Sequence, residues 1–334
     1  MSTTKKSRAG CGEPCYDAPH MRNKWMCFVS TSFFLLALAG IVGAKGSQLG
    51  EAKGSLSKGT HVVLLGTGNP SPDPDRAGPS TAIVVNGSAY LVDMGAGVIR
   101  RAAAAERKGI APLGVCNLKI VFVTHLHSDH TIGYPDLITT PAVICRAARL
   151  EAYGPKGLKA MTDGILQAYS EDIDIRVNGL EHGNPDAYRV KVHEIEPGVV
   201  YKDANVIVKA FSVPHGSWPQ AFGYRFETAD KTIVISGDTA PSQSVIDACN
   251  GCDILLHEAY AVGGLKGSPD ARKKYFESFH TSTAELADLA AKAKPKLLIL
   301  YHQMPLSSTF EELLKEVQSR YKGAVVNGND LDVF

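Results

Sequence analysis

The segment THLHSDHTIGYPDL, residues 124–137, places three histidines and an aspartate within six positions, directly after the apolar run KIVFV. In an extended segment, His125 and His127 at i and i+2 can point to the same side and share one metal ion. Asp129 and His130 lie beyond a turn and can serve a second ion. A catalytic zinc usually has three protein ligands and one position for water. Four donors are too many for one such ion and too few for two, so the segment predicts half of a two-metal hydrolytic centre.

Three further donors follow other apolar runs and can complete both ligand sets. His215 comes after VKAFSVP, Asp238 after TIVISG and His302 after KLLILY. His215 can complete the first ion's protein ligands, and His302 can complete the second's. Asp238 can bridge both ions through its two oxygens. Ions about 3.5–4 Å apart can lower the pKa of a bridging water to roughly 7, which supplies hydroxide at neutral pH.

The elements that must position these donors are short β-branched strands alternating with helices. Residues 95–109 (GAGVIRRAAAAERKG) are alanine-rich and indicate a helix. Residues 282–295 indicate another, with Ser282 and Glu285 in capping-box spacing and Pro295 at its end. The pattern predicts an α/β fold with at least two sheet-like groups of strands. The predicted strands are 61–65, 81–85, 89–93, 119–124, 205–213, 231–236, 253–257 and 296–302.

Five of these strands deliver a potential ligand or acid–base group at their carboxyl ends, where ligands gather in α/β folds. His257 and Glu258 follow the strand DILL in this way. Two interpretations of this pair stay open. Both residues could support the metal ligands from behind, or both could make ordinary hydrogen bonds in the core.

The motifs resemble a known family. HLHSDH, followed by Asp238 in SGDTA, resembles the metallo-β-lactamase superfamily over roughly residues 60–334. SVPHGSWPQAFGYRFE, LLHEAY and FHTSTAEL resemble its ribonuclease Z and arylsulfatase-like branch. The resemblance implies an αββα sandwich of two mixed β-sheets flanked by helices, in a single catalytic domain. It also implies two zinc ions, with Mn²⁺ or Fe as alternatives. Their ligands would be His125, His127 and His215 on one ion, Asp129, His130 and His302 on the other, and Asp238 between them.

The resemblance also implies roles in the reaction. Asp129 would orient or deprotonate the attacking water. Asp93 in LVDMG would be a structural hydrogen-bonder to the metal loop, not a ligand. His280 would protonate the leaving group or hold the scissile phosphate. The position of His280 in the sequence supports this last role. It precedes a capped helix N-terminus, which is a favourable place to bind an anionic oxygen. A plain surface histidine is the alternative for His280.

Three features argue against tRNA as the substrate: a missing arm, a slightly acidic domain and the export-type N-terminus described below. Ribonuclease Z enzymes that process tRNA typically carry a long inserted arm between the third-motif histidine and the bridging aspartate. Here His215 and Asp238 are only 23 residues apart, which leaves room for one β-hairpin. Residues 1–58 carry eight Lys or Arg and three Asp or Glu, so the remainder carries 27 and 31, a formal charge of −4. The composition of residues 59–334 therefore gives no indication of a surface that binds polyanions such as nucleic acids.

The substrate expected from the sequence is therefore a small phosphodiester or aryl sulfate ester. Aromatic side chains near the ligand loops fit a small aryl group: Tyr134, Trp218, Phe222 and Tyr301. The alternatives are RNA, with tRNA 3′ processing as the reaction, and a lactam or lactone ring. A non-catalytic metal-binding module is a minor alternative, because degenerate members usually drop ligands and all seven positions are filled here. A homodimer is a further open alternative.

The N-terminus predicts targeting. Residues 25–44 form an uncharged stretch of 20 residues after a basic leader at 1–24, and residues 45–59 form a Gly/Ser/Lys-rich linker to the hydrolase domain at 60–334. The stretch is typical of a signal peptide or a membrane anchor, and Met21 is an alternative start. We expect a domain that is periplasmic, secreted or anchored to a membrane.

Cys249 and Cys252 have the spacing of half a zinc knuckle, and no second CxxC completes it. The favoured interpretation is a helix end, with glycine stopping the helix before the strand DILLHE. A local disulfide or redox role is the less favoured alternative.

Overall fold

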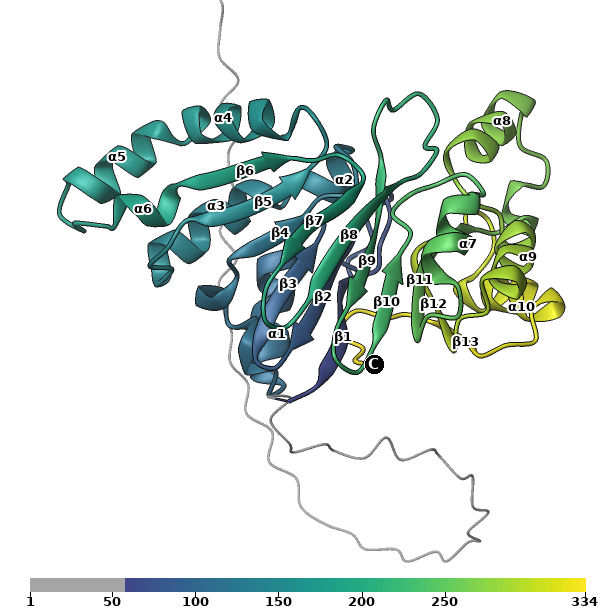
Figure 1. Cartoon of the computed structure of the whole chain (residues 1–334). Helices are drawn as coiled ribbons and strands as arrows, with labels where there is room; N and C mark the ends of the chain where they lie inside the picture. Colours follow the sequence, from purple (N-terminus) through teal and green to yellow (C-terminus); the bar gives the residue numbers. More distant parts are fainter. Residues whose placement is uncertain (1–57) are drawn as a thin grey trace, which may run out of the picture. The chain divides into compact units, whose positions relative to one another are not determined.

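The computed structural model describes residues 58–334, in which the apolar runs pair into two mixed β-sheets (Figure 1). The first has six strands in the order β1-β2-β3-β4-β5-β6, and the second has seven in the order β13-β12-β11-β10-β9-β8-β7. In each sheet the strands that come first in the chain pair antiparallel and the later ones pair parallel. The strands are β1 (Thr60–Gly66), β2 (Ser80–Val85), β3 (Ser88–Val92), β4 (Ile120–Phe122), β5 (Leu150–Gly154), β6 (Val190–Glu194), β7 (Gly198–Lys202), β8 (Ile207–Ser212), β9 (Phe222–Glu227), β10 (Thr232–Ile235), β11 (Ile254–Tyr260), β12 (Leu297–Met304) and β13 (Val325–Asn327).

Helices cover the outer face of each sheet, and α8 lies at one end of the second sheet (Figure 1). Short 3₁₀ turns span Ala111–Leu113, Val115–Asn117 and Gly263–Leu265. The α-helices are α1 (Val98–Arg107), α2 (Ser128–Thr131), α3 (Tyr134–Ile144), α4 (Leu158–Ala168), α5 (Ser170–Asn178), α6 (Pro185–Tyr188), α7 (Gln243–Cys249), α8 (Asp270–Phe279), α9 (Thr283–Ala293) and α10 (Phe310–Arg320).

Successive side chains of a strand point to opposite faces of the sheet, and in both sheets the side chains on both faces are apolar and buried. In β1, Val63 and Leu65 pack in one cluster with residues of α1 and α3, whereas Val62 and Leu64 pack in the cluster between the sheets. A third cluster packs the other face of β10, β11 and β12 against α7, α9 and α10. A one-residue slip in pairing would exchange these faces, so burial on both sides fixes the register. The predicted αββα sandwich is confirmed.

Both predicted helices form. Residues 98–107 are helical as α1, and α9 begins after Ser282 with the predicted capping box. The Ser282 side chain accepts from the backbone of Glu285, and the Glu285 side chain accepts from the backbone of Ser282. This box fixes where α9 begins, and it therefore helps to place His280, which lies two residues before Ser282.

The cysteine prediction needs a correction. Helix α7 ends at Cys249 and β11 follows, as expected, although the residue that turns the chain first is Asn250, with a left-handed φ of 40°. Cys249 and Cys252 also form a disulfide across a Cα–Cα distance of 4.8 Å, which was the less favoured interpretation. A second disulfide, Cys116–Cys145, joins residues whose Cα atoms lie 5.3 Å apart. Both distances lie within the range for disulfides.

The N-terminal predictions fall outside the described residues. These are the leader at 1–24, the targeting stretch at 25–44 and nearly all of the linker at 45–59. They stay predictions, as does the domain boundary at residue 60. Between residues 58 and 334, no helix combines the length and the apolar composition needed to cross a bilayer.

Candidate metal centre

The loop that carries the first four donors runs from the end of β4 into α2, and Asp93 holds it in place. Asp93 Oδ1 accepts a hydrogen bond from the Thr124 amide at 2.8 Å. Its Oδ2 accepts one from the Thr124 hydroxyl at 2.8 Å and one from His130 Nδ1 at 2.9 Å. The carboxylate of Asp93 thus lies behind the loop and outside the donor groups described below.

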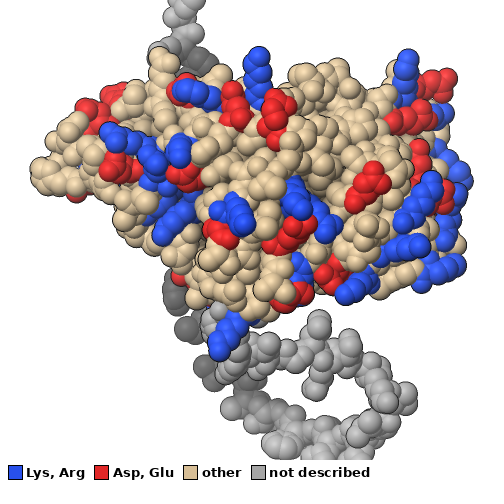
Figure 2. Space-filling view, viewed as in Figure 1, with Lys and Arg blue, Asp and Glu red and all other residues tan. Residues whose placement is uncertain are grey.

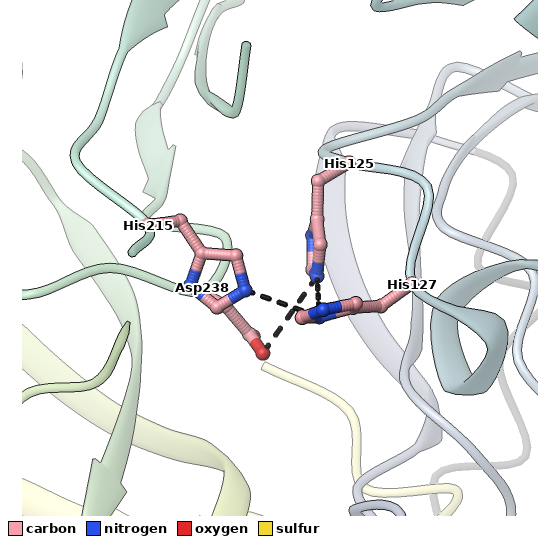
Figure 3. A group of neighbouring side chains, drawn as sticks. All are labelled: His125, His127, His215 and Asp238. Carbon is pink, nitrogen blue, oxygen red and sulfur yellow. Dashed lines mark hydrogen bonds and ion pairs between the residues drawn. The ribbon is translucent and has the colours of Figure 1, made fainter. Parts of the chain in front are cut away.

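The first donor group contains His125, His127, His215 and Asp238, whose ligand atoms all lie within 4.8 Å of one another (Figure 3). Nδ1 of His127 lies 3.0 Å from Nε2 of His125 and 3.1 Å from Nε2 of His215. Asp238 Oδ2 lies 3.9 Å from Nε2 of His125. Three imidazoles and one carboxylate therefore converge on one point, from three separate segments of the chain.

The second donor group contains Asp129, His130 and His302. Asp129 Oδ2 lies 3.1 Å from Nε2 of His302 and 3.6 Å from Nε2 of His130. Asp238 reaches this group as well, because its Oδ1 lies 3.4 Å from Nε2 of His130 and its Oδ2 lies 3.4 Å from Nε2 of His302. The structure brings together all seven residues proposed as ligands and places Asp238 between the two groups.

Contacts on the outer side of three rings fix which nitrogen faces the centre. His125 Nδ1 donates to the Thr124 hydroxyl at 3.0 Å, and His215 Nδ1 donates to the carbonyl of Phe279 at 2.7 Å. His130 Nδ1 faces Asp93 in the same way. His125 and His215 therefore present Nε2, with its lone pair, to the centre, which is the arrangement that a metal needs, and His130 presents its Nε2 to Asp238. The Phe279 carbonyl and Thr124 were not identified from the sequence.

The donor set fits zinc. His130 Nε2 and Asp238 Oδ1 are fully buried without a hydrogen-bond partner and face each other. Buried polar atoms almost always have a partner, and imidazole with carboxylate is zinc's usual ligand chemistry. Burial lowers the pKa of His125 far below its ordinary value and that of His215 to about 4, so both rings are neutral at physiological pH and could bind a metal. Mn²⁺ and Fe also accept such ligands.

Two residues of the site adopt left-handed backbone conformations that favour glycine. Asp93 has a φ of 61° and His302 has a φ of 44°. Such conformations cost on the order of 1–3 kcal/mol and persist only where the surrounding structure enforces them. Here they direct one side chain to the metal loop and the other to the second donor group.

His280 lies between α8 and α9, beside the centre but outside both donor groups. Its Nδ1 is 3.5 Å from Glu258 Oε1 and 3.9 Å from Asp238 Oδ2. Burial alone would lower the pKa of His280, but the adjacent Glu258 carboxylate outweighs burial and raises it. A protonated imidazole near neutral pH can act as a general acid. His280 is only 5% exposed, which does not fit a plain surface histidine.

Glu258 and His257 differ in their surroundings. Glu258 Oε1 accepts hydrogen bonds from the amides of Thr281 (2.9 Å) and Thr239 (3.4 Å) and faces His280. Glu258 therefore orients the His280 ring through this contact, and it does not belong to either donor group. His257 is buried and donates from Nδ1 to the Glu258 carbonyl at 2.7 Å. This is the ordinary core hydrogen bond that was one of the two interpretations.

Among the four aromatic residues expected near the substrate, Trp218 alone is accessible. Tyr134, Phe222 and Tyr301 are buried in the core, so they cannot contact a substrate. Trp218 Nε1 donates to Nε2 of His127 at 2.7 Å. Indole is only a donor, so His127 carries its hydrogen on Nδ1 in this contact. Metal binding at Nδ1 of His127 would require the ring hydrogen on Nε2, and the indole would then lose its acceptor.

A cleft of about 800 Å³ opens beside the second donor group. Its walls are the loop at 69–78 and the first turns of α1, and its floor includes Ser128 and Asp129. Arg100 of α1 lines the cleft and is exposed. The Asp129 carboxylate therefore connects the donor groups with a space that is large enough for a substrate.

The fold and the site define a class of protein. A family model described as the beta-lactamase superfamily domain matches residues 88–303. The chain belongs to the metallo-β-lactamase superfamily and is a metal-dependent hydrolase with a His/Asp metal site.

Curated relatives define the branch. Ribonuclease Z of Mycobacterium marinum is 33% identical over 276 residues, which are 81% of this chain and 96% of that protein. Ribonuclease Z of Mycobacterium sp. (strain KMS) is 36% identical over 247 residues, which are 73% of this chain and 84% of that protein. The chain therefore belongs to the ribonuclease Z branch of the superfamily.

Solved structures share the fold. The short form of human tRNase Z matches with a TM-score of 0.60 and 24% identity, over 82% of this chain and 98% of that chain. YhfI of Bacillus subtilis, a metallo-beta-lactamase fold protein, matches with a TM-score of 0.62 and 17% identity over the same shares. These likenesses support the two-sheet architecture and say nothing of the substrate.

Proposed function

We propose that this protein is a two-zinc phosphodiesterase that cleaves RNA endonucleolytically, in the manner of a ribonuclease Z that matures the 3′ end of tRNA. One observation carries the proposal. A complete set of seven donors, arranged in two groups about Asp238, occurs in a chain that matches ribonuclease Z relatives over nearly their whole length. The ligand roles of the seven residues are part of this proposal.

The residues present can perform the reaction. A pair of bound zinc ions would supply a hydroxide nucleophile and would polarise the phosphoryl oxygens. Burial would raise the pKa of Asp129, but His302 and His130 hold it below its ordinary value, so the carboxylate can accept the proton of the attacking water. His280 then donates a proton to the leaving oxygen, and Glu258 stabilises the positive charge on that ring.

The comparisons support the RNA alternative better than the small ester that the sequence favoured. The predicted hairpin is present, because β9 and β10 pair antiparallel between His215 and Asp238. Relatives named ribonuclease Z nevertheless match this chain over 96% of their length, so the missing arm does not separate the chain from them. Acidic and basic side chains are intermixed on the face shown in Figure 2, which neither favours nor opposes RNA strongly.

A second candidate function is favoured by the disulfides. Disulfides persist in oxidising compartments and are rare in the cytosol. Together with the targeting stretch predicted at 25–44, the pairs Cys116–Cys145 and Cys249–Cys252 support an exported domain. Such a domain would use the same centre on RNA or a small phosphodiester outside the cytosol.

The test is cleavage by the full-length, zinc-loaded protein. We expect precursor tRNA with a 3′ trailer to be cut at one position, with activity lost to a chelator and restored by zinc. Bis(p-nitrophenyl) phosphate, p-nitrophenyl sulfate and a chromogenic cephalosporin serve as comparison substrates. Turnover of the phosphodiester without tRNA cleavage would favour the second candidate. Faster turnover of the sulfate or the cephalosporin would contradict both.

A further inference from the structure

Trp218 stands beside the first donor group and has no role in the reaction described so far. Its indole lies with its ring centroid 5.0 Å from that of His127 and nearly perpendicular to it. The residue is partly exposed, in the turn that follows the donor His215. The indole therefore lies directly beside a side chain that is proposed to hold a metal.

A pocket of about 360 Å³ opens on the same side of the centre. It begins at the ligand loop itself, because Leu126 lies between the donors His125 and His127. Most of its walls are apolar or planar and would accept a flat ring. Its lining residues are Leu126, Pro155, Lys156, Trp218, Pro219 and Gln220.

The polar groups of the pocket indicate which chemical group of a ligand could bind beside a flat ring. The Gln220 amide is already engaged, since its Oε1 accepts from the Lys156 amide at 2.8 Å and its Nε2 donates to Glu196 at 3.0 Å. Lys156 is exposed, and the lysines that form ion pairs within residues 58–334 are others: Lys159, Lys191, Lys209, Lys273 and Lys296. The pocket therefore offers one aromatic face and one available positive charge, which complement a base and a phosphate.

We infer that Trp218 forms a nucleobase subsite, in which the base of a nucleotide flanking the scissile phosphodiester stacks on the indole and its phosphate meets Lys156. This inference rests on the proposed action on RNA. Single-stranded RNA is commonly held by stacking of its bases on aromatic side chains. The volume suits a single base, and the larger cleft at Asp129 would take the rest of the strand. Because every base has an aromatic face, the subsite should tolerate any base.

The test compares two ligands that differ only in the base. Adenosine 5′-monophosphate and ribose 5-phosphate are titrated into full-length, zinc-loaded protein by calorimetry. Stacking on one aromatic side chain changes affinity by about 5- to 150-fold. We expect the nucleotide to bind more tightly than ribose 5-phosphate by a factor in this range. Trp218→Ala should lose that advantage, whereas Trp218→Phe should keep most of it. Tyr169→Ala, which removes an exposed aromatic side chain on the α4–α5 connection, is the matched control.

Kinetics on precursor tRNA separate this inference from the proposed function. We expect Trp218→Ala to raise KM by a similar factor and to leave kcat and the zinc content nearly unchanged. Equal binding of the two ligands to the wild type, or an unchanged KM in Trp218→Ala, would overturn the subsite even if tRNA is cleaved. Loss of zinc from Trp218→Ala and Trp218→Phe alike would also overturn it, because Trp218 would then be structural. If tRNA is not cleaved but the nucleotide preference depends on Trp218, the subsite stands and the proposed function fails.

Discussion

Asp238→Ala is expected to lose metal and activity together, for every substrate. The two carboxylate oxygens of Asp238 face His130 and His302 at 3.4 Å and His125 at 3.9 Å, so a single substitution removes a donor from both groups. Residues that only orient a ligand typically contribute 10- to 100-fold to metal affinity, and a shared direct ligand should contribute more. Zinc content should fall below one per chain, and hydrolysis should fall to background.

Folding must be monitored in the same experiment, because Asp238 is buried among histidines. His130 would lose one of the two carboxylates that raise its pKa, the other being Asp93. Circular dichroism of the variant should remain that of the folded protein. Asp163→Ala, which removes an exposed aspartate of α4, is the matched control and should keep both zinc ions. An Asp238→Ala protein that is folded and retains two zinc ions would show that this residue does not bridge the groups.

His280→Ala is expected to have the opposite signature, with metals retained and turnover lost. His280 belongs to neither donor group, and its side chain faces Glu258 and Asp238 from the side of the centre. General acid catalysis typically contributes 10²–10⁴-fold, so kcat on precursor tRNA should fall by roughly that factor. The loss should be smaller with bis(p-nitrophenyl) phosphate, since a nitrophenolate leaves without protonation. Equal losses on both substrates, or a loss of zinc, would contradict the role of general acid.

The pH dependence of kcat provides a second test of His280 as the general acid. The Glu258 carboxylate raises the pKa of His280, so the acid form persists to higher pH than it would otherwise. The activity that depends on this acid is present below the His280 pKa and is lost as pH rises through it. Glu258→Gln should therefore move the alkaline limb of the kcat profile to lower pH.

The donors could be found from the sequence because they lie in the loop after one apolar run, residues 125–130, or close after three others, at His215, Asp238 and His302. Strand ends are visible wherever β-branched residues give way to polar ones, and carboxyl ends of strands converge in α/β folds. The same reasoning missed strands whose pattern is weak. Both β6 and β7 lie at the edges of their sheets and contain no fully buried residue, so they leave little apolar signal. The short strand β13 was missed for a similar reason.

Other features of the site depend on three-dimensional contacts that leave no local pattern. The Phe279 carbonyl that orients His215 is 64 residues away in the chain, and the indole that contacts His127 is 91 residues away. Asp93 and His302 have left-handed φ angles although neither is glycine, so these backbone conformations could not be predicted from the residue types. The disulfide Cys116–Cys145 joins cysteines 29 residues apart, where the sequence alone cannot decide the pairing.

The sequence favoured a small ester as the substrate, whereas the comparisons support the RNA alternative better. A missing arm and a slightly acidic body were weighed against tRNA, but both describe parts of the surface and not the centre. Ribonuclease Z of Mycobacterium marinum nevertheless matches this chain over 96% of its own length and 81% of this chain.

Zinc stoichiometry tests the two-metal centre most directly. Full-length protein is loaded with zinc, dialysed and measured by elemental analysis alongside His125→Ala, His302→Ala and the control His193→Ala. His193 pairs with Glu151 at 2.7 Å and belongs to neither donor group. We expect two zinc ions per chain in the wild type and in His193→Ala, and about one in each of the other two variants. Fewer than one tightly bound zinc in fresh wild-type protein, or two in both ligand variants, would contradict the dinuclear centre.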